Sequence, residues 1–285
     1  MEKNNIGSIS VISTPIGNSE DITIRAIRTL NEIDIIACED TRVTSRLCNM
    51  HKINYKGKLM SYHEHNSIKM IPIILKKLKE GFNVGLVTDA GTPLISDPGY
   101  KLIRKALDNN VIVKSVPGAS ALTAAISIAG ISTDQFVFSG FLPRKESLRN
   151  KKLSLLAGLQ SSIIIFENAT RINKLLKELY SSLGNRNISI IREITKIYEE
   201  NIRGNIKDVI KLLENKKVKG ELVILIEKPE EDNNIYTDEK IIDMLKIDIS
   251  KLGISKASKK ISKITSIKSD YIYKLALTLN KSGFK

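Results

Sequence analysis

The sequence predicts an α/β protein, with two α/β domains followed by a small C-terminal helical domain. Short apolar runs alternate with segments of helical spacing, which is typical of strands and helices in a layered sheet. This alternation restarts after Val116, and the polar segment 228–234, which contains Pro229, reads as a linker. We therefore expect three domains, at residues 1–116, 117–229 and 235–285.

In the first domain, short connections between the apolar runs favour a largely parallel sheet. The expected strands are residues 8–14, 34–39, 58–63, 83–89 and 111–116. The expected helices are residues 22–31, 67–80 and 99–108. Apolar residues of the middle helix, such as Ile74 and Leu78, form one stripe, so we expect that helix to pack on the sheet.

The second domain repeats the alternation with its own apolar runs. The expected helices are residues 120–129, 145–157, 170–181 and 205–215, and the expected strands are residues 135–140, 162–166, 187–192 and 221–227. In the tail, Thr237, Ser255 and Ser269 are each placed to cap a segment with helical spacing. Three short helices are therefore expected there.

The charge is strongly positive. The chain has 285 residues, 42% of them hydrophobic, and a formal net charge of +14. Such a charge favours a polyanionic partner, either nucleic acid or an anionic membrane surface, although a compositional bias toward Lys, Ile and Asn is the alternative. Residues 240–285 hold eleven Lys against three Asp, which favours a functional basic surface. We expect phosphate contacts through Lys256, Lys259, Lys260 and Lys263.

The cysteine content and the N-terminus favour a cytoplasmic protein. Cys38 and Cys48 are the only cysteines, and the N-terminus has no basic-then-apolar signal segment. The longest uncharged stretch, 115–133, contains Pro117 and many small residues, so we interpret it as a buried helix and not a membrane span. No Cys/His set has metal-ligand spacing, and neither a dinucleotide fingerprint nor a Walker A loop is present.

The segment "VTDAGTPLISDPGY" (87–100) follows an apolar strand directly and is rich in Pro and Gly. In α/β proteins, ligands bind at the carboxyl ends of strands. Ala90 and Gly91 leave room for a ligand, Pro93 fixes the turn, and free N–H and C=O groups could hold the ligand. A stiff loop without a ligand is the alternative. We interpret Asp97 as part of the start of the next helix, not as a cofactor contact.

Two other segments occupy comparable positions. "STPIGNSEDIT" (13–23) follows the first strand and is either a ligand-binding turn or an ordinary capped turn. "VPGASALTAA" (116–125) opens a helix whose first N–H groups are free, which alone is a weak indication of an anion or ligand site.

These segments occur together with "ACEDTR" (37–42), "SYHEHN" (61–66), "SGFLPRK" (139–145), "IFENATR" (165–171) and "REITKIYEENIRG" (192–204). In this combination and order, the chain resembles the ribosomal RNA small-subunit methyltransferase I family of the tetrapyrrole methylase superfamily. The resemblance covers about residues 7–228 and, more loosely, the basic tail. Two positions depart from the family pattern, namely Ser19 and the pair Ala169-Thr170.

The resemblance implies two α/β domains of tetrapyrrole methylase type, with S-adenosylmethionine in a cleft between them, and a homodimer. It implies 2′-O-methylation of a cytidine ribose in the decoding region of small-subunit (16S) rRNA, free or in the assembled subunit. The cofactor-binding residues implied by the motifs are Pro15, Asp89, Ala90, Gly91, Pro93, Ile95, Ser96, Gly118, Ala119, Ser120, Ala121, Glu221 and Leu222.

A ribose hydroxyl is a weak nucleophile, so a general base or a polarising group is expected. The catalytic candidates are Glu39, Arg42 and Lys196, with Asp40 and Glu193 as further possible bases. Arg42 and Arg192 are better interpreted as phosphate or nucleobase contacts, and a structural ion pair is the alternative for each residue. Two other functions are alternatives to rRNA methylation. The protein could be a small-molecule tetrapyrrole methyltransferase or a non-catalytic ribosome-assembly factor that binds RNA. The basic tail argues against the first of these.

Overall fold

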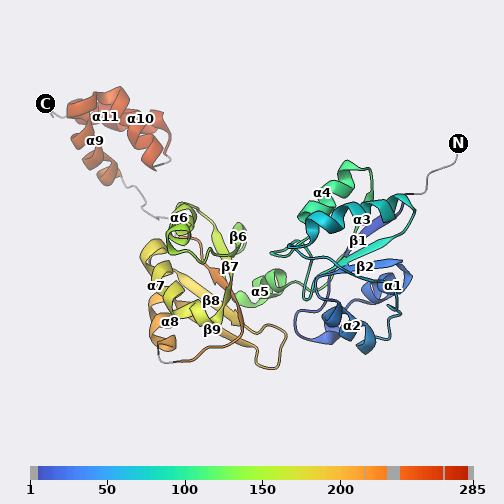
Figure 1. The fold of residues 1–285 in the computed structure, drawn as a ribbon. Coiled ribbons are helices and arrows are strands. Elements are labelled where there is room, and N and C mark those ends of the chain that lie inside the picture. The colour runs from blue at the N-terminus through green and yellow to red at the C-terminus, as the bar shows by residue number, and fades with distance from the viewer. Residues whose placement is uncertain (1–5, 215, 230–237, 266, 282–285) are drawn as a thin grey trace. The chain divides into compact units, whose positions relative to one another are not determined.

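The computed structural model describes residues 6–214, 216–229, 238–265 and 267–281, except for the side chains of residues 251, 263, 280 and 281. The chain divides into two compact units, residues 1–229 and residues 230–285. The first unit contains two sheets flanked by helices, and the second contains three helices (Figure 1). The predicted fold class is confirmed. Both sheets belong to the first unit, so separate domains at residues 1–116 and 117–229 stay a proposal.

The first sheet has five parallel strands in the order β3-β2-β4-β1-β5. The strands are β1 (Ser8–Ile12), β2 (Ile35–Cys38), β3 (Leu59–Ser61), β4 (Val84–Val87) and β5 (Ile112–Val116). The central strand, β4, is buried along its whole length. Because the strands are parallel, their carboxyl ends lie at one edge of the sheet, and the loops that follow β1, β2, β4 and β5 start there.

Helices cover both faces of this sheet. They are the short η1 (Ser19–Asp21), α1 (Ile24–Glu32), α2 (Thr41–Met50), α3 (Ser67–Lys79) and α4 (Tyr100–Asp108). Successive side chains of β4 point to opposite faces. Leu86 therefore packs in a cluster with Ile74 of α3, whereas Val87 packs in another with Leu30 of α1 and Cys48 of α2.

The second sheet has the order β6-β7-β10-β8-β9. The strands are β6 (Phe136–Phe141), β7 (Ser162–Asn168), β8 (Asn187–Arg192), β9 (Glu200–Asn205) and β10 (Glu221–Ile226). Only β6 and β7 pair in parallel, and the other three pairings are antiparallel. As a result, the ends of β6, β7 and β8 and the start of β10 share one edge.

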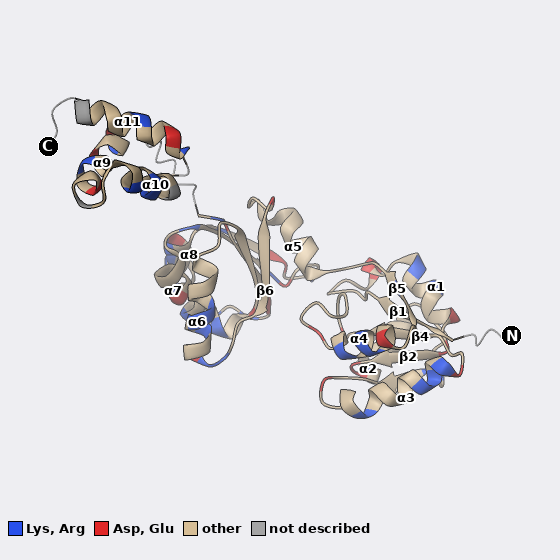
Figure 2. Cartoon of the chain, turned by 90° about the horizontal axis from the view of Figure 1, so that it is seen from above, with Lys and Arg blue, Asp and Glu red and all other residues tan. Residues whose placement is uncertain are grey.

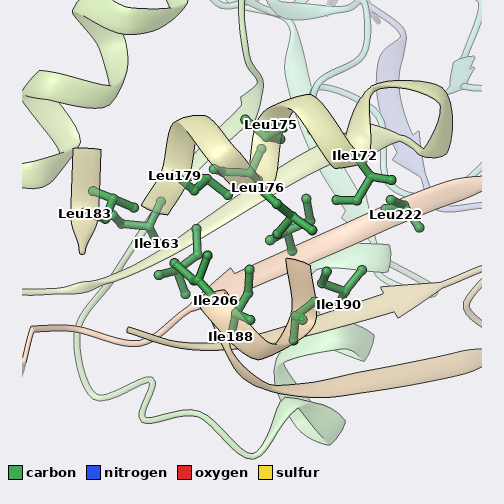
Figure 3. Close-up of a cluster of buried hydrophobic side chains, with 14 of the residues drawn as sticks. Ile163, Ile172, Leu175, Leu176, Leu179, Leu183, Ile188, Ile190, Ile206 and Leu222 are labelled. Atoms are coloured by element: carbon green, nitrogen blue, oxygen red, sulfur yellow. The ribbon is translucent and has the colours of Figure 1, made fainter. Parts of the chain in front are cut away.

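Helices flank the second sheet as well. They are α5 (Ala121–Ala129), α6 (Glu146–Ala157), the short η2 (Ala169–Arg171), α7 (Ile172–Leu183) and α8 (Ile206–Leu213). Leu175, Leu176 and Leu179 of α7 are buried in one cluster with Ile163 and Ile190 of the sheet (Figure 3). The small side chains of α5 pack in a separate cluster with β7, β8 and β10, which lets this helix approach the sheet closely.

Besides the short η1, two elements differ from the prediction. No helix was predicted at α2, whose sequence "TRVTSRLCNM" contains three β-branched residues. Its start is fixed instead by Asp40, whose side chain accepts a hydrogen bond from the N–H of Arg42. No strand was predicted at β9, which lies at the sheet's edge, where Ile202 is its one buried residue.

The second unit is a three-helix bundle. It consists of α9 (Asp238–Leu252), α10 (Ile254–Thr265) and α11 (Ser269–Lys281), which bury Ile241, Leu245, Ala257, Ile261, Ile272 and Ala276. Helix α10 begins one residue before Ser255, which is therefore not its cap, and Ser269 is the first residue of α11. Thr237, the third predicted cap, lies outside the described residues. None of the helices that the structure describes is long and apolar enough to cross a membrane.

Candidate active site

A cavity of about 320 Å³ lies in the first unit. One wall comes from the edge of the first sheet at which its strands end. The other comes from the edge of the second sheet at which β6, β7 and β8 end and β10 begins. The wall from the first sheet and the start of α5 consists of Ile16, Glu39, Asp89, Ala90, Gly91, Thr92, Ile95, Ser96, Asp97, Ser120 and Ala121. The wall from the second sheet consists of Phe141, Phe166, Glu167, Glu193, Ile194, Lys196, Glu221, Leu222 and Val223. Carboxyl ends of strands are where α/β sheets bind ligands, so this cavity is the candidate active site.

The loop after β4 is fixed to its neighbours by hydrogen bonds. The Thr14 N–H donates to the Gly91 carbonyl (2.9 Å), and the Gly91 N–H donates to the Thr14 carbonyl (3.0 Å). The Thr92 hydroxyl donates to the Ala119 carbonyl (3.0 Å) and lies 2.8 Å from the Ser13 hydroxyl. The loops after β1, β4 and β5 are therefore held together as one preorganised wall.

Gly91 has a steric role in this wall. Its φ is +81°, and a Cβ atom there would lie 3.2 Å from Cγ2 of Ile16. Its N–H and C=O both bond Thr14, so at this residue the backbone is not free for a ligand, contrary to the expectation from the sequence. The space left by the missing side chain is what Gly91 contributes to the cavity.

Unfavourable backbone conformations gather around the cavity. Six described residues other than glycine have a positive φ, and four of them are Leu94, Ser96, Glu193 and Thr195. These four lie in the loops after β4 and β8, both of which line the cavity. Strain of this kind costs about 1–3 kcal/mol per residue and collects at functional sites. The positions of the four support a functional role for the cavity.

The loop after β8 lies against the turn after β1. The Asn18 N–H donates to the Thr195 hydroxyl (3.2 Å). A Cβ atom on Gly17 would lie 2.5 Å from Cγ of Lys196 and 2.6 Å from Oγ1 of Thr195. Only glycine permits this approach, which joins the two sides of the cavity at one point.

Carboxylates dominate the polar lining of the cavity. Six acidic residues line it, against one Lys. Burial, and then the charge of Asp89, raise the pKa of Glu39. Burial, and then the charges of Glu39 and Asp89, raise the pKa of Asp97 to about 7. Such a lining attracts cations and repels phosphate groups.

Lys196 is the single cation among the described residues that line the cavity. Its ammonium lies 3.0 Å from Oε1 of Glu193 and 2.9 Å from Oε2 of Glu221. Burial acts to lower its pKa, but the hydrogen bonds to Glu221 and Glu193 outweigh burial and raise the pKa. Lys196 therefore stays protonated at neutral pH and does not act as a base, although it can orient the two carboxylates.

Asp97 makes the stability of the protein depend on pH. Its pKa is about 7 in the folded state and 3.8 in its ordinary state, so between these values the folded chain holds the extra proton. Stability should therefore fall as the pH rises through this window. Asp97→Asn lacks this titration. We therefore expect its free energy of unfolding, relative to that of the wild type, to rise by about 1–2 kcal/mol between about pH 5 and about pH 8. One pKa unit corresponds to about 1.4 kcal/mol, and partial exposure reduces the effect.

Urea unfolding of both proteins at the two pH values measures this difference. An equal offset between the variant and the wild type at both pH values would contradict it.

The structure brings most of the predicted site residues together. The predicted residues that line the cavity are Glu39, Asp89, Ala90, Gly91, Ile95, Ser96, Ser120, Ala121, Lys196, Glu221 and Leu222. Pro15, Pro93, Gly118 and Ala119 lie in the same loops but do not line it. Gly118 instead allows close packing, since a Cβ atom there would lie 3.1 Å from Cβ of Ser13. The roles of all these residues stay predictions.

The remaining predicted residues lie elsewhere. The Arg42 side chain is 88% exposed and forms a 2.6 Å ion pair with Asp40, outside the cavity lining. This pairing lowers the pKa of Asp40 to about 2, which makes Asp40 a poor base. Arg192 forms a 3.3 Å ion pair with Glu200 of the neighbouring strand.

The predicted phosphate contacts lie on α10 of the second unit. Lys256 and Lys259 are exposed, and Lys260 forms a 2.8 Å ion pair with Asp248. The side chain of Lys263 lies outside the described residues. Figure 2 shows the basic residues along this helix.

Sequence reasoning missed several cavity residues. Asp97 was assigned to the start of the next helix, but it precedes α4 by three residues and lines the cavity. Phe141, Phe166 and Glu167 were quoted only as parts of motifs. Because β6 and β7 are parallel, their carboxyl ends lie at one edge of the sheet. Phe141 and Phe166 lie near these ends, and their rings are 5.7 Å apart. Mapping the motifs onto strand ends was the signal that could have found them.

Comparison with known proteins identifies the family. A family model described as Tetrapyrrole (Corrin/Porphyrin) Methylases matches residues 8–210. A protein of Rickettsia prowazekii named ribosomal RNA small subunit methyltransferase I is 44% identical over 239 residues, which are 83% of this chain and 82% of that protein. The chain belongs to the ribosomal RNA small-subunit methyltransferase I family of the tetrapyrrole methylases. The predicted family is therefore confirmed.

The sequence of another relative aligns with almost the whole of this methylase. The protein of the same name from Synechocystis sp. is 37% identical over 281 residues, which are 98% of this chain and 100% of that protein. The match includes the basic tail, so the tail belongs to the length that the two proteins share.

Solved structures share the fold of this methylase. A cobalt precorrin-4 methyltransferase matches with a TM-score of 0.59 and 18% identity over 80% of this chain and 97% of its own. A uroporphyrin-III C-methyltransferase from Thermus thermophilus, complexed with S-adenyl homocysteine, matches with a TM-score of 0.55 and 18% identity over 77% of this chain and 97% of its own. At this identity the likeness concerns the fold.

Proposed function

We propose that this protein transfers a methyl group from S-adenosylmethionine to the 2′-oxygen of a cytidine ribose in the decoding region of small-subunit rRNA. The protein is a methyltransferase by family, and its relatives are named for small-subunit rRNA. The observation that carries the proposal is the preorganised, acidic cavity where the two sheets meet. A cytoplasmic location and a homodimer belong to the same proposal.

The cavity fits S-adenosylmethionine. Its carboxylates suit a sulfonium and an ammonium group, and apolar residues such as Ile95, Phe166 and Leu222 suit an adenine ring. The residues that would hold the cofactor are Asp89, Ala90, Gly91, Ile95 and Ser96 on one wall and Ser120, Ala121, Glu221 and Leu222 on the other. Pro15, Pro93, Gly118 and Ala119 would support these walls from behind.

S-adenosylmethionine held by these residues would supply an activated methyl group on its sulfonium. The ribose oxygen would accept this methyl group, and the sulfur would keep the electron pair of the broken carbon–sulfur bond. Alignment of the reactants can contribute about 7–11 kcal/mol. The fixed loops of the first wall supply that alignment.

The hydroxyl proton must pass to a base of the protein. Three cavity carboxylates have a pKa that burial raises, namely Glu39, Asp89 and Asp97. Asp89 already accepts a hydrogen bond from the N–H of Asp40 (3.0 Å) and is proposed to hold the cofactor, so Glu39 and Asp97 are the candidates for the base. Of the two, Glu39 is our choice, because it follows β2 directly while Asp97 is protonated over more of the neutral range. Lys196 would orient the carboxylates of Glu193 and Glu221, and Arg42 would bind a phosphate or nucleobase of the substrate.

The basic tail is proposed to bind the RNA backbone. Deleting residues 237–285 should weaken rRNA binding and flatten its dependence on salt, since each lost phosphate contact reduces the slope of log K against log[salt] by about 0.7–0.9. Filter binding over a salt series measures both effects. The deletion should leave cofactor affinity unchanged, because residues 1–229 form a compact unit with the cavity. Unchanged RNA affinity and slope would contradict a role for the tail.

The function itself is tested by transfer of a labelled methyl group. With labelled S-adenosylmethionine, the protein should label small-subunit rRNA, free or in assembled subunits, and not large-subunit rRNA or a uroporphyrin-type tetrapyrrole. Label on the tetrapyrrole would support the small-molecule alternative. Cofactor binding without any transfer would contradict catalysis on both substrates.

A further inference from the structure

A second cavity, of about 220 Å³, lies beside the candidate active site. It is lined by Arg144, Arg149, Glu167, Thr170, Arg171, Lys174, Leu175 and Glu178, which come from the loop after β6, from α6, from the end of β7 and from the segment that opens α7. Four of these side chains are cationic and two are acidic. The motifs "SGFLPRK" and "IFENATR" supply Arg144, Thr170 and Arg171, for which the proposed methyl transfer has no role.

Arg149 gives this cavity a rigid frame. Its side chain is 8% exposed and forms two hydrogen bonds with Glu178, at 2.6 and 2.7 Å. Its third nitrogen donates to the carbonyls of Pro143 and Arg144, at 3.1 and 2.8 Å. All three guanidinium nitrogens of Arg149 thus have acceptors, and they hold the loop that carries Arg144 in place.

Two other arginines retain unused hydrogen-bond donors. Arg171 donates to Oε1 of Glu167 from Nε (2.8 Å), and its Nη2 lies 2.6 Å from the same oxygen. Its Nη1 is buried and meets no acceptor among the described residues. The side chain of Arg144 is exposed and, within the described part of the chain, forms no hydrogen bond or ion pair. An acceptor with several oxygens would satisfy both guanidinium groups.

The acidic residue Glu167 joins the second cavity to the active site. Its carboxylate is 1% exposed, and the residue lines both cavities. The active-site cavity has an acidic lining, so it disfavours the phosphates that flank a ribose. A cationic cavity next to it could hold one of those phosphates while the ribose enters the acidic one.

We propose that the cavity containing Arg144 and Arg171 binds a backbone phosphate of the RNA substrate next to the methylated nucleotide. The proposal rests on the proposed function for its RNA partner. The guanidinium groups bind the phosphate oxygens, and Glu167 positions Arg171. A free anion, such as phosphate or a substrate carboxylate, presents similar oxygens, and the experiment separates these sources.

The first test compares Arg144→Gln with a matched control, Arg28→Gln. Both residues are exposed and both changes remove one charge, but Arg28 lies on α1 and lines neither cavity. We expect Arg144→Gln to raise KM for small-subunit rRNA about tenfold and to reduce the salt slope by about 0.7–0.9. The kcat and the Kd for S-adenosylmethionine should not change. Equal effects of the two substitutions would overturn the proposal.

The second test uses inorganic phosphate as the probe. Phosphate should raise the thermal midpoint of the wild type above its value in chloride of equal ionic strength, and this gain should be smaller in Arg144→Gln and in Arg171→Lys. If phosphate stabilises the wild type but Arg144→Gln leaves KM for small-subunit rRNA unchanged, the cavity binds a free anion, and the RNA part of the proposal is wrong.

This probe also separates the new site from the proposed function. If the wild type methylates no rRNA, the proposed function fails, while the phosphate titration still decides whether the cavity binds an anion. If phosphate stabilises all the variants as it does the wild type, the site itself is wrong.

Discussion

Replacing Gly91 by Val is expected to weaken S-adenosylmethionine binding by at least about 100-fold, which corresponds to about 2.7 kcal/mol. A Cβ atom at this position would lie 3.2 Å from Cγ2 of Ile16, which also lines the cavity, so the larger side chain of Val takes up space there. The φ of +81° is also unfavourable for a β-branched residue. Isothermal titration with the cofactor measures the loss, and methyl transfer should fall with it.

A control must separate occupied space from backbone strain. Gly57 has a φ of +76° and no atom within 4 Å of its Cβ position, so Gly57→Val introduces a similar strain away from the cavity. We expect a similar decrease in thermal stability for the two variants, but loss of cofactor binding only for Gly91→Val. A folded Gly91→Val protein that binds the cofactor normally would refute the assignment of this loop.

Changing Glu39 to Gln is expected to lower kcat by about 10²–10⁴-fold, the usual contribution of a general base. The substitution keeps the size of the side chain, so the Kd for S-adenosylmethionine should change less than about threefold. A base works when it is deprotonated, and the pKa of Glu39 is raised by burial and by Asp89. The wild-type rate should therefore rise with pH through that pKa, and the variant should lose this part of the profile.

Asp97→Asn is the comparison that makes this result specific. If Glu39 accepts the proton, Asp97→Asn should keep most of the activity. Full activity of Glu39→Gln together with a large loss in Asp97→Asn would transfer the role to Asp97, and full activity of both would exclude a carboxylate base at these two positions.

The sequence was sufficient to locate every described strand except β9, together with the loops at their carboxyl ends. Apolar runs such as 84–87 are unambiguous because both faces of a central parallel strand are buried. Glycine and proline after these runs then marked the loop that contains Ala90 and Gly91, whereas Asp89 and Ser96 were implied by the family resemblance. What these residues do in the cavity follows only from their contacts, as the bridge between Gly91 and Thr14 illustrates.

The features that were missed depend on tertiary packing. The helix α2 is stabilised by its cap and by the burial of Thr44 and Cys48, not by propensity. Arg42 is adjacent in sequence to the cavity residue Glu39, but the helix directs its side chain to solvent and to Asp40. Asp97 looked like a helix start, because nothing local reveals that Glu39 and Asp89 lie close to it.

The most direct test of the proposed function is mass spectrometry of nucleosides from small-subunit rRNA, after incubation with the protein and S-adenosylmethionine carrying a labelled methyl group. We predict labelled 2′-O-methylcytidine from the decoding region, and none with Gly91→Val. Label on a base, on another ribose or on no nucleoside, from a protein that binds the cofactor, would contradict the proposed function.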